Sequence, residues 1–121
     1  MNLFGARHTR ARGNAIEREA EKFLRRQGLT LVECNYTVKM GEIDLIMRDQ
    51  NTLIFIEVRY RNNSNYGSGA ASVTAKKQRR LKLAAQHYLA LKFGAAEPDC
   101  RFDVMSGCGE PVVFEWIKNA F

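Results

Sequence analysis

Two carboxylates stand inside a stretch of the chain that is otherwise apolar. Residues 41–61 read GEIDLIMRDQNTLIFIEVRYR, which we interpret as two strands joined by a polar turn. Asp44 falls in the first strand and Glu57 in the second, where charged side chains are uncommon. The loop of this hairpin can contain two or four residues. Both lengths give the same register, which is the pairing of residues across the two strands. In that register Asp44 faces Glu57, so the sequence predicts two carboxylates side by side.

Such a pair needs a positive partner. Directly opposed side chains lie about 5 Å apart, and two negative charges at that distance repel by on the order of 3 kcal/mol at an effective dielectric of about 20. One candidate partner is Mg²⁺ or Mn²⁺, which takes carboxylate oxygens as ligands and lowers the pKa of a bound water. The other is Arg59, which shares a face with Glu57 and lies opposite Glu42 in the register. The hairpin pattern leaves both interpretations open.

The alternation of the two strands predicts one fully apolar face and one face that carries the carboxylates. The apolar face is expected to comprise Ile43, Leu45, Met47, Ile54, Ile56 and Val58. The other face is expected to comprise Glu42, Asp44, Ile46 and Arg48 from the first strand, and Leu53, Phe55, Glu57 and Arg59 from the second.

A helix is predicted before the hairpin, over residues 14–27, because its apolar residues recur with helical spacing and Gly28 follows as a stop. Glu17 falls at the border of the buried stripe, from which it can reach toward the carboxylates. The alternative is an ordinary first-turn glutamate favoured by the helix dipole. Residues 1–12 have no hydrophobic period and are expected to form a flexible basic arm in front of a single domain, 13–121.

Positive charge is concentrated directly after the hairpin. The net charge of the chain is +6, and residues 59–92 contain no acidic residue. Their cationic residues are Arg59, Arg61, Lys76, Lys77, Arg79, Arg80, Lys82 and Lys92. A cationic segment next to a carboxylate pair indicates a polyanion, with nucleic acid as the expected partner. The alternative is an ordinary solvated helix face.

Most of these cations fall on a second predicted helix, which begins after Thr74 as its cap and ends near Lys92. Its buried residues are expected to be Leu81, Ala84, Ala85, Tyr88 and Leu89. Gln78 lies on the inner side, where its amide can orient a water or a phosphate or can cap a backbone group. The polar, glycine-rich residues 62–72 are expected to form a flexible loop that either closes over a ligand or merely connects.

Three more strands are expected, at 29–36, 101–105 and 112–117, and Asp103 is expected to be a structural hydrogen-bonding group. The order α, β, β, β, α, β, β predicts an α/β fold with a mixed sheet flanked by helices. Three cysteines without a CxxC pair, and no long apolar run, favour a cytoplasmic protein without a membrane partner.

These motifs together resemble a known pattern. An Asp in one strand, followed after thirteen positions by Glu-x-Lys in the next, is the pattern of the restriction-endonuclease-like nucleases, which Asp44, Glu57 and Arg59 resemble; an upstream helical Glu resembles their Holliday junction resolvase branch. The chain is more closely similar to the bacterial family called YraN-like. The matching stretches are Gly13-x-x-x-Glu17-x-x-Ala20, Asn35, GEIDLI at 41–46, FIEVRYR at 55–61, Lys77 with Arg80-Leu81, the 85–89 helix, RFDV at 101–104 and WIKNAF at 116–121.

The resemblance implies a restriction-endonuclease-like fold and a nuclease that uses Mg or Mn to cut DNA, with branched structures as one candidate substrate and a homodimer as one candidate assembly. It makes Asp44, Glu57 and Glu17 the metal ligands and catalytic residues, together with Arg59. It also implies a set of nucleic-acid-binding residues: Arg61, Lys76, Lys77, Gln78, Arg79 and Arg80.

The chain departs from the nuclease pattern at one position, because Arg59 stands where a lysine is expected. Arginine stays protonated and so cannot act as a general base, although it can hold a phosphate. Two alternatives therefore stand beside the nuclease. One is a nucleic-acid-binding or assembly module in which Asp44, Glu57 and Arg59 form an ion network, and the other is a domain whose basic helix docks on an acidic protein.

Overall fold

The computed structural model describes the backbone of residues 7–61 and 73–121, and the side chains of residues 15–61 and 73–121. In chain order the elements are α1 (Arg7–Arg26), β1 (Thr30–Val38), β2 (Gly41–Asp49), β3 (Thr52–Arg61), α2 (Ala75–Phe93), β4 (Asp99–Cys108) and β5 (Val113–Ile117). The predicted α/β fold and its element order are confirmed. The predicted loop 62–72 lies outside the described residues.

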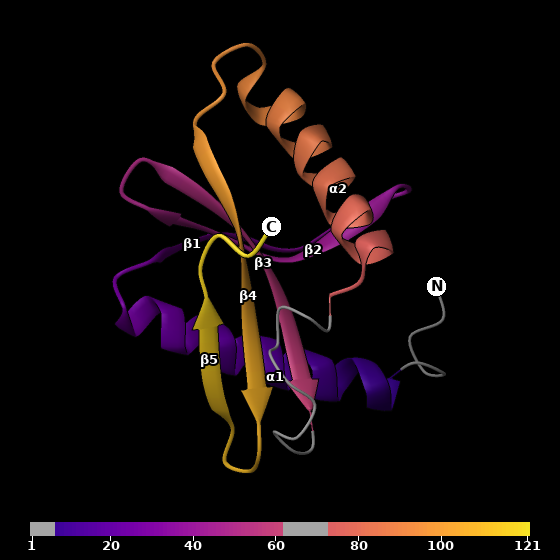
Figure 1. Cartoon of the computed structure of the whole chain (residues 1–121), viewed down its shortest axis with the longest axis vertical. Helices are drawn as coiled ribbons and strands as arrows, with labels where there is room; N and C mark the ends of the chain where they lie inside the picture. The colour runs from indigo at the N-terminus through magenta and orange to yellow at the C-terminus, as the bar shows by residue number, and fades with distance from the viewer. Residues whose placement is uncertain (1–6, 62–72) are drawn as a thin grey trace.

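The five strands form one mixed sheet in the order β1-β2-β3-β4-β5. β3 and β4 pair in parallel and the other neighbours pair antiparallel. α2 belongs to the crossover between the two parallel strands, which a parallel pair requires. In Figure 1, α1 passes behind the sheet, whereas α2 lies in front of β2. This is the architecture expected of a restriction-endonuclease-like fold.

Both faces of the β2–β3 hairpin are buried, each under one helix. Leu45, Met47, Ile54 and Ile56 pack in a cluster with Ala20 and Leu24 of α1. Ile46, Leu53 and Phe55 pack in a second cluster with the buried side of α2, whose members are those predicted: Leu81, Ala84, Ala85, Tyr88 and Leu89.

The predicted division of the hairpin into an apolar and a polar face is therefore wrong in two respects. The face assigned to the carboxylates is buried along much of its length, because α2 covers Ile46, Leu53 and Phe55. Ile43 packs in this α2 cluster and not with Leu45. The strict alternation fails at Asp44, next to the point where β2 and β3 stop pairing.

The predicted hairpin register is confirmed near the turn, from Leu45↔Ile56 to Asp49↔Thr52. The ladder ends there, and Glu42 lies opposite Thr37 of β1. The predicted pairing of Glu42 with Arg59 is thus wrong, because it assumed that the β2–β3 ladder continues to the end of both strands.

Helix boundaries were predicted with unequal success. α2 begins after Thr74, whose hydroxyl accepts the Lys77 N–H, and ends at Phe93 with Gly94 as its C-cap, close to the predicted end near Lys92. α1 begins at Arg7, earlier than the predicted 14. The expected arm, 1–12, thus overlaps this helix over 7–12, and residues 1–6 lie outside the described ones. Arginine and alanine favour helix without a hydrophobic period, so the absence of a period misplaced the boundary.

Gly41 fixes the position of α2 on the sheet. The residue is buried at the start of β2, where a Cβ would overlap the backbone carbonyl of Arg80. Only glycine allows a strand and a helix backbone to approach this closely. This contact places the first turns of α2 beside the end of β2 that carries Asp44.

No helix in the described ranges, 7–61 and 73–121, is long and apolar enough to cross a membrane.

Candidate functional site

Three predicted site residues, Glu17, Asp44 and Glu57, come together where α1 passes the diverging strands β2 and β3. Asp44 interacts through its charge and through side-chain hydrogen bonding with both Glu17 and Glu57. We call these three residues the carboxylate cluster. Asp44 lies at its centre, and the two glutamates approach Asp44 from α1 and β3.

Asp44 also has a structural task. Its Oδ2 accepts the backbone N–H of Val58 at 2.8 Å, just beyond the last β2–β3 pair. The carboxylate replaces the carbonyl that an unbroken ladder would offer at this point. The divergence of the strands is therefore stabilised by the same residue that lies at the centre of the cluster.

The cluster is short of positive charge. Burial raises the pKa of Glu57 to about 8, with further increases from the charge and hydrogen bond of Asp44 that Lys77 and Arg59 only partly oppose. Burial likewise raises the pKa of Glu17 to about 7, with Asp44 and Glu42 adding negative charge and a hydrogen bond from Asn35 acting the other way. Near neutral pH the glutamates therefore retain protons that a stronger cation would displace.

Two side-chain cations approach the cluster at a single atom. Arg59 Nη1 lies 3.7 Å and Lys77 Nζ lies 4.0 Å from Glu57 Oε2. Both distances exceed a good hydrogen bond. The Arg59 interaction is the salt bridge that the sequence offered as the alternative to a metal. Lys77, expected among the nucleic-acid contacts, lies at the cluster itself.

The donor set suits a divalent cation. Glu17 Oε1 is buried and has no hydrogen-bond partner among the described residues, and such an acceptor costs free energy until a proton or cation reaches it. Carboxylate oxygens are the ligands that Mg²⁺ and Mn²⁺ prefer. Within the described side chains, however, no group of three His, Cys, Asp or Glu residues is arranged to hold a metal ion as it stands. The cluster consists of two interacting pairs that share Asp44.

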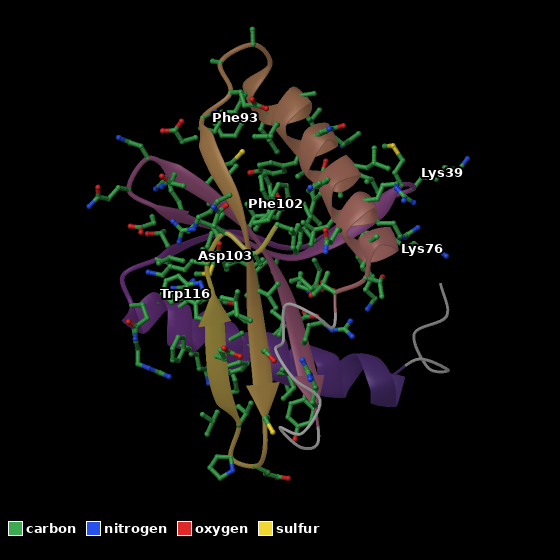
Figure 2. The ribbon with its side chains drawn as sticks, in the orientation of Figure 1. Lys39, Lys76, Phe93, Phe102, Asp103 and Trp116 are labelled. Carbon is green, nitrogen blue, oxygen red and sulfur yellow. The ribbon has the colours of Figure 1, made fainter. Side chains whose placement is uncertain are left out.

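The predicted nucleic-acid-binding residues mostly lie on one surface. Lys76, Arg79 and Arg80 are exposed on the first turns of α2. Lys39, in the β1–β2 turn, lies on the same side of the molecule as Lys76 in Figure 2. Arg61 is partly buried at the end of β3. This basic surface adjoins the cluster through Lys77.

Gln78 does not face the cluster as a free amide. Its Nε2 donates to the carbonyl of Val73 at 3.0 Å, which is the backbone-capping alternative given by the sequence. Its role is to stabilise the entry to α2.

Asp103 is structural, as predicted. It is fully buried and accepts hydrogen bonds from Arg101 Nε, Trp116 Nε1 and the Asn119 N–H. Figure 2 shows Asp103 with Trp116 nearby, on the β4–β5 side of the sheet.

Two residues of the site were not assigned to it from the sequence. Asn35, which has a positive φ of 53°, donates a side-chain hydrogen bond to Glu17. Its signal was an amide that interrupts a strand. Lys77 lies four residues before Leu81 and eight before Ala85, so helical spacing aligns it with the buried stripe of α2, but its approach to the cluster depends on how α2 packs.

The carboxylate cluster is separate from two hollows that the described residues form. These hollows, of about 970 and 740 Å³, lie beside α1 and the β4–β5 turn and at the β2–β3 turn, and no member of the carboxylate cluster lines either of them. What adjoins the cluster is the basic surface of α2, which suits a polyanion.

Comparison with known proteins identifies relatives over almost the whole chain. A UPF0102 protein of Dechloromonas aromatica is 50% identical over 113 residues, which is 93% of this chain and 90% of the relative. A UPF0102 protein of Nitrosospira multiformis is 51% identical over 114 residues, 93% of each chain. One of Pectobacterium carotovorum is 48% identical over 113 residues, 93% of this chain and 94% of the relative.

The model of "Uncharacterised protein family UPF0102" matches residues 16–106, a range that contains the carboxylate cluster and the whole of α2. The resemblance to the YraN-like family is therefore confirmed, and the chain belongs to the UPF0102 family.

Proposed function

We propose that this protein is a metal-dependent nuclease that cuts DNA, with branched DNA as the favoured substrate. The observation that carries the proposal is the carboxylate cluster, which is short of positive charge and lies beside a basic helix. A structural cluster of this kind would be expected to have its charges matched, whereas Glu17 Oε1 is buried without a partner in the part of the chain that the structure describes.

Asp44, Glu57 and Glu17 would hold Mg²⁺ or Mn²⁺, which when bound supplies an activated water and stabilises negative charge on the phosphate. Asp44 is already oriented by the Val58 N–H. Asn35 orients Glu17 from β1 through its side-chain hydrogen bond. Arg59 cannot remove a proton from water, so its part is electrostatic.

The exposed cations of α2 would hold the DNA backbone next to the cluster, because Lys76, Arg79 and Arg80 share the turns that lead to Lys77. Phosphate contacts of this kind position DNA without reading bases. They fit a nuclease that selects a structure and not a sequence. The cytosol is the compartment that we propose.

The test uses labelled duplex, flap and four-way-junction DNA with Mg²⁺ or Mn²⁺. Asp44→Asn is preferable to Asp44→Ala, because the amide oxygen still accepts the Val58 N–H. We expect wild type to cut the junction, Asp44→Asn and Glu57→Gln to lose at least about a hundredfold in rate, and exposed Asp99→Asn to match wild type. Equal cleavage by all four proteins would attribute the activity to a contaminant and sink the proposal.

A second candidate function rests on a specific observation. Arg59 and Lys77 both lie near Glu57 Oε2, as they would in an ion network that binds nucleic acid without cutting it. That module would bind junction DNA in a salt-sensitive manner, with or without metal, and would never cleave it. Sedimentation of the protein with and without junction DNA tests the expected homodimer in the same samples.

A further inference from the structure

We propose that Lys77 of α2 is a catalytic residue, which presents its ammonium group to the phosphate that is cut. The nuclease pattern gives this task to the position of Arg59. The inference rests on the proposed nuclease function and adds to it a charge supplied by a different element. It also makes the first turns of α2 part of the catalytic centre and not only of the DNA-binding surface.

The first step is the place of Lys77 relative to the cluster. Its Nζ lies 4.0 Å from Glu57 Oε2, although twenty residues separate the two in the sequence. Among the side chains that the structure describes, Lys76, Arg79 and Arg80 form no ion pair with the cluster. These three residues point into solvent, and Lys77 differs from them by its direction on the helix.

The second step is that this place is fixed by the backbone. Gly41 packs directly against the carbonyl of Arg80, one helical turn after Lys77. Thr74 caps the Lys77 N–H from the preceding turn. The helix is thus held on both sides of Lys77, and only the lysine side chain is left to move.

The third step is what the ammonium can reach. The Lys77 side chain is 48% exposed, against 13% for Glu57, so the amine lies at the border between the cluster and solvent. A metal that takes Glu57 would displace an ammonium that shares Oε2 with Arg59. With Glu57 held by a metal, the Lys77 ammonium at this border would be available to a bound phosphate as a compact point charge with three donors.

The test compares two lysines in adjacent positions. Lys77→Met and Lys76→Met each remove one charge from the same turn of α2, but only Lys77 approaches the cluster. At saturating junction DNA we expect Lys77→Met to cut at least about a hundredfold more slowly, as for loss of one charge-stabilising donor. We expect Lys76→Met to act mainly on binding, by raising the DNA concentration needed for half-saturation, and exposed Lys92→Met in the last turn of α2 to match wild type. Equal saturated rates would overturn the inference while leaving the nuclease proposal intact.

A second readout does not depend on cleavage. Reductive methylation of lysine amines is measured by mass spectrometry with junction DNA and Ca²⁺, in wild type and in Asp44→Asn. We expect DNA to protect Lys77 only with Ca²⁺ and an intact Asp44, and to protect Lys76 in every sample. If wild type never cuts, the nuclease proposal fails on that result alone. Protection of Lys77 without metal, or in Asp44→Asn, would show a surface contact and overturn the inference.

Discussion

Asp103 and Glu57 are acidic residues of the two parallel strands, but their surroundings are opposite. Asp103 is fully buried and has a donor at hydrogen-bond distance on each side: Arg101 Nε at 3.0 Å, Trp116 Nε1 at 2.9 Å and the Asn119 N–H at 2.9 Å. Among the described side chains, Glu57 has cations at 3.7 and 4.0 Å and a second carboxylate beside it.

The difference separates a carboxylate that holds the fold from one that is available to a ligand. Asp103 connects β4, β5 and the residues after β5 through donors that leave no place for another group. Within the described residues, the cations near Glu57 stay beyond good hydrogen-bond distance, and the pKa of Glu57 is raised to about 8 because burial and Asp44 outweigh Lys77 and Arg59. A buried acid held in this way is a candidate functional group.

The largest expected effect on stability comes from changing Asp103, the carboxylate whose hydrogen bonds are all made. Asp103→Asn removes the charge that pairs with Arg101 and leaves that cation partly buried, so we expect a loss of about 3 to 5 kcal/mol in the free energy of unfolding. Urea unfolding followed by circular dichroism measures it, because the fluorescence of Trp116 would change with its own partner. Asp99→Asn, exposed on the same strand, should change it by less than about 0.5 kcal/mol. A cost below about 1 kcal/mol for Asp103→Asn would contradict the structural role.

The next largest expected effect on stability comes from binding a divalent cation to the carboxylate cluster. Mn²⁺ at a hundred times its dissociation constant should raise the free energy of unfolding by about 2.7 kcal/mol. Because the metal must displace protons from Glu17 and Glu57, its affinity should rise between pH 6 and pH 8.5. Titration calorimetry in two buffers of different ionisation enthalpy measures both the affinity and the protons released. Asp44→Asn should abolish the binding, and a pH-independent affinity would show that the metal binds elsewhere.

The third effect is the pH dependence of the metal-free protein. The pKa values of Glu17 and Glu57 in the folded state, about 7 and about 8, exceed their ordinary value of 4.5, so the folded state binds more protons than the unfolded state. Stability is therefore greatest at low pH within this range and falls as pH rises toward 8. We expect the free energy of unfolding to fall by on the order of 2 kcal/mol between pH 5.5 and pH 8.5. The two glutamates do not contribute independently, because the same Asp44 raises both pKa values.

Glu57→Gln supplies the control for this pH dependence, since the amide does not titrate. Relative to wild type, the variant should gain stability as pH rises, and its own curve should be flatter. If the free energies of unfolding of the two proteins change in parallel over pH 5.5 to 8.5, the folded protein does not raise the pKa of Glu57.

The parts of the fold that the sequence predicted are those in which buried residues recur with a regular spacing. The buried residues of α2 repeat with helical spacing, and the β2–β3 register near the turn follows from the turn itself, so both were predictable. Ile43 was assigned to the wrong face because the alternation fails next to Asp44. The start of α1 was missed because residues 7–12 show no hydrophobic period.

The candidate site was predictable where it is local and not where it is assembled by packing. Asp44 and Glu57 stand out as charges in apolar strands, and Glu17 stands out at the edge of a helix stripe. The position of Lys77 depends on how α2 packs, which is set by the contact between Gly41 and the Arg80 backbone. That contact joins residues that are far apart in the sequence, so no local sequence pattern predicts it.

The smallest expected effect is that of Arg59→Lys, which compares the two cations at Glu57 directly. The side chain of Arg59 is 27% exposed and its Nη1 is 3.7 Å from Glu57 Oε2, so the free energy of unfolding should change by less than about 0.5 kcal/mol. If Lys77 supplies the compact amine, the rate of cleavage at saturating DNA should stay within about threefold of wild type. A tenfold gain would show instead that arginine had weakened a site that needs its lysine there. The same change in a Lys77→Met background is the sharper comparison, because a restored rate would prove that the two positions provide one interchangeable charge.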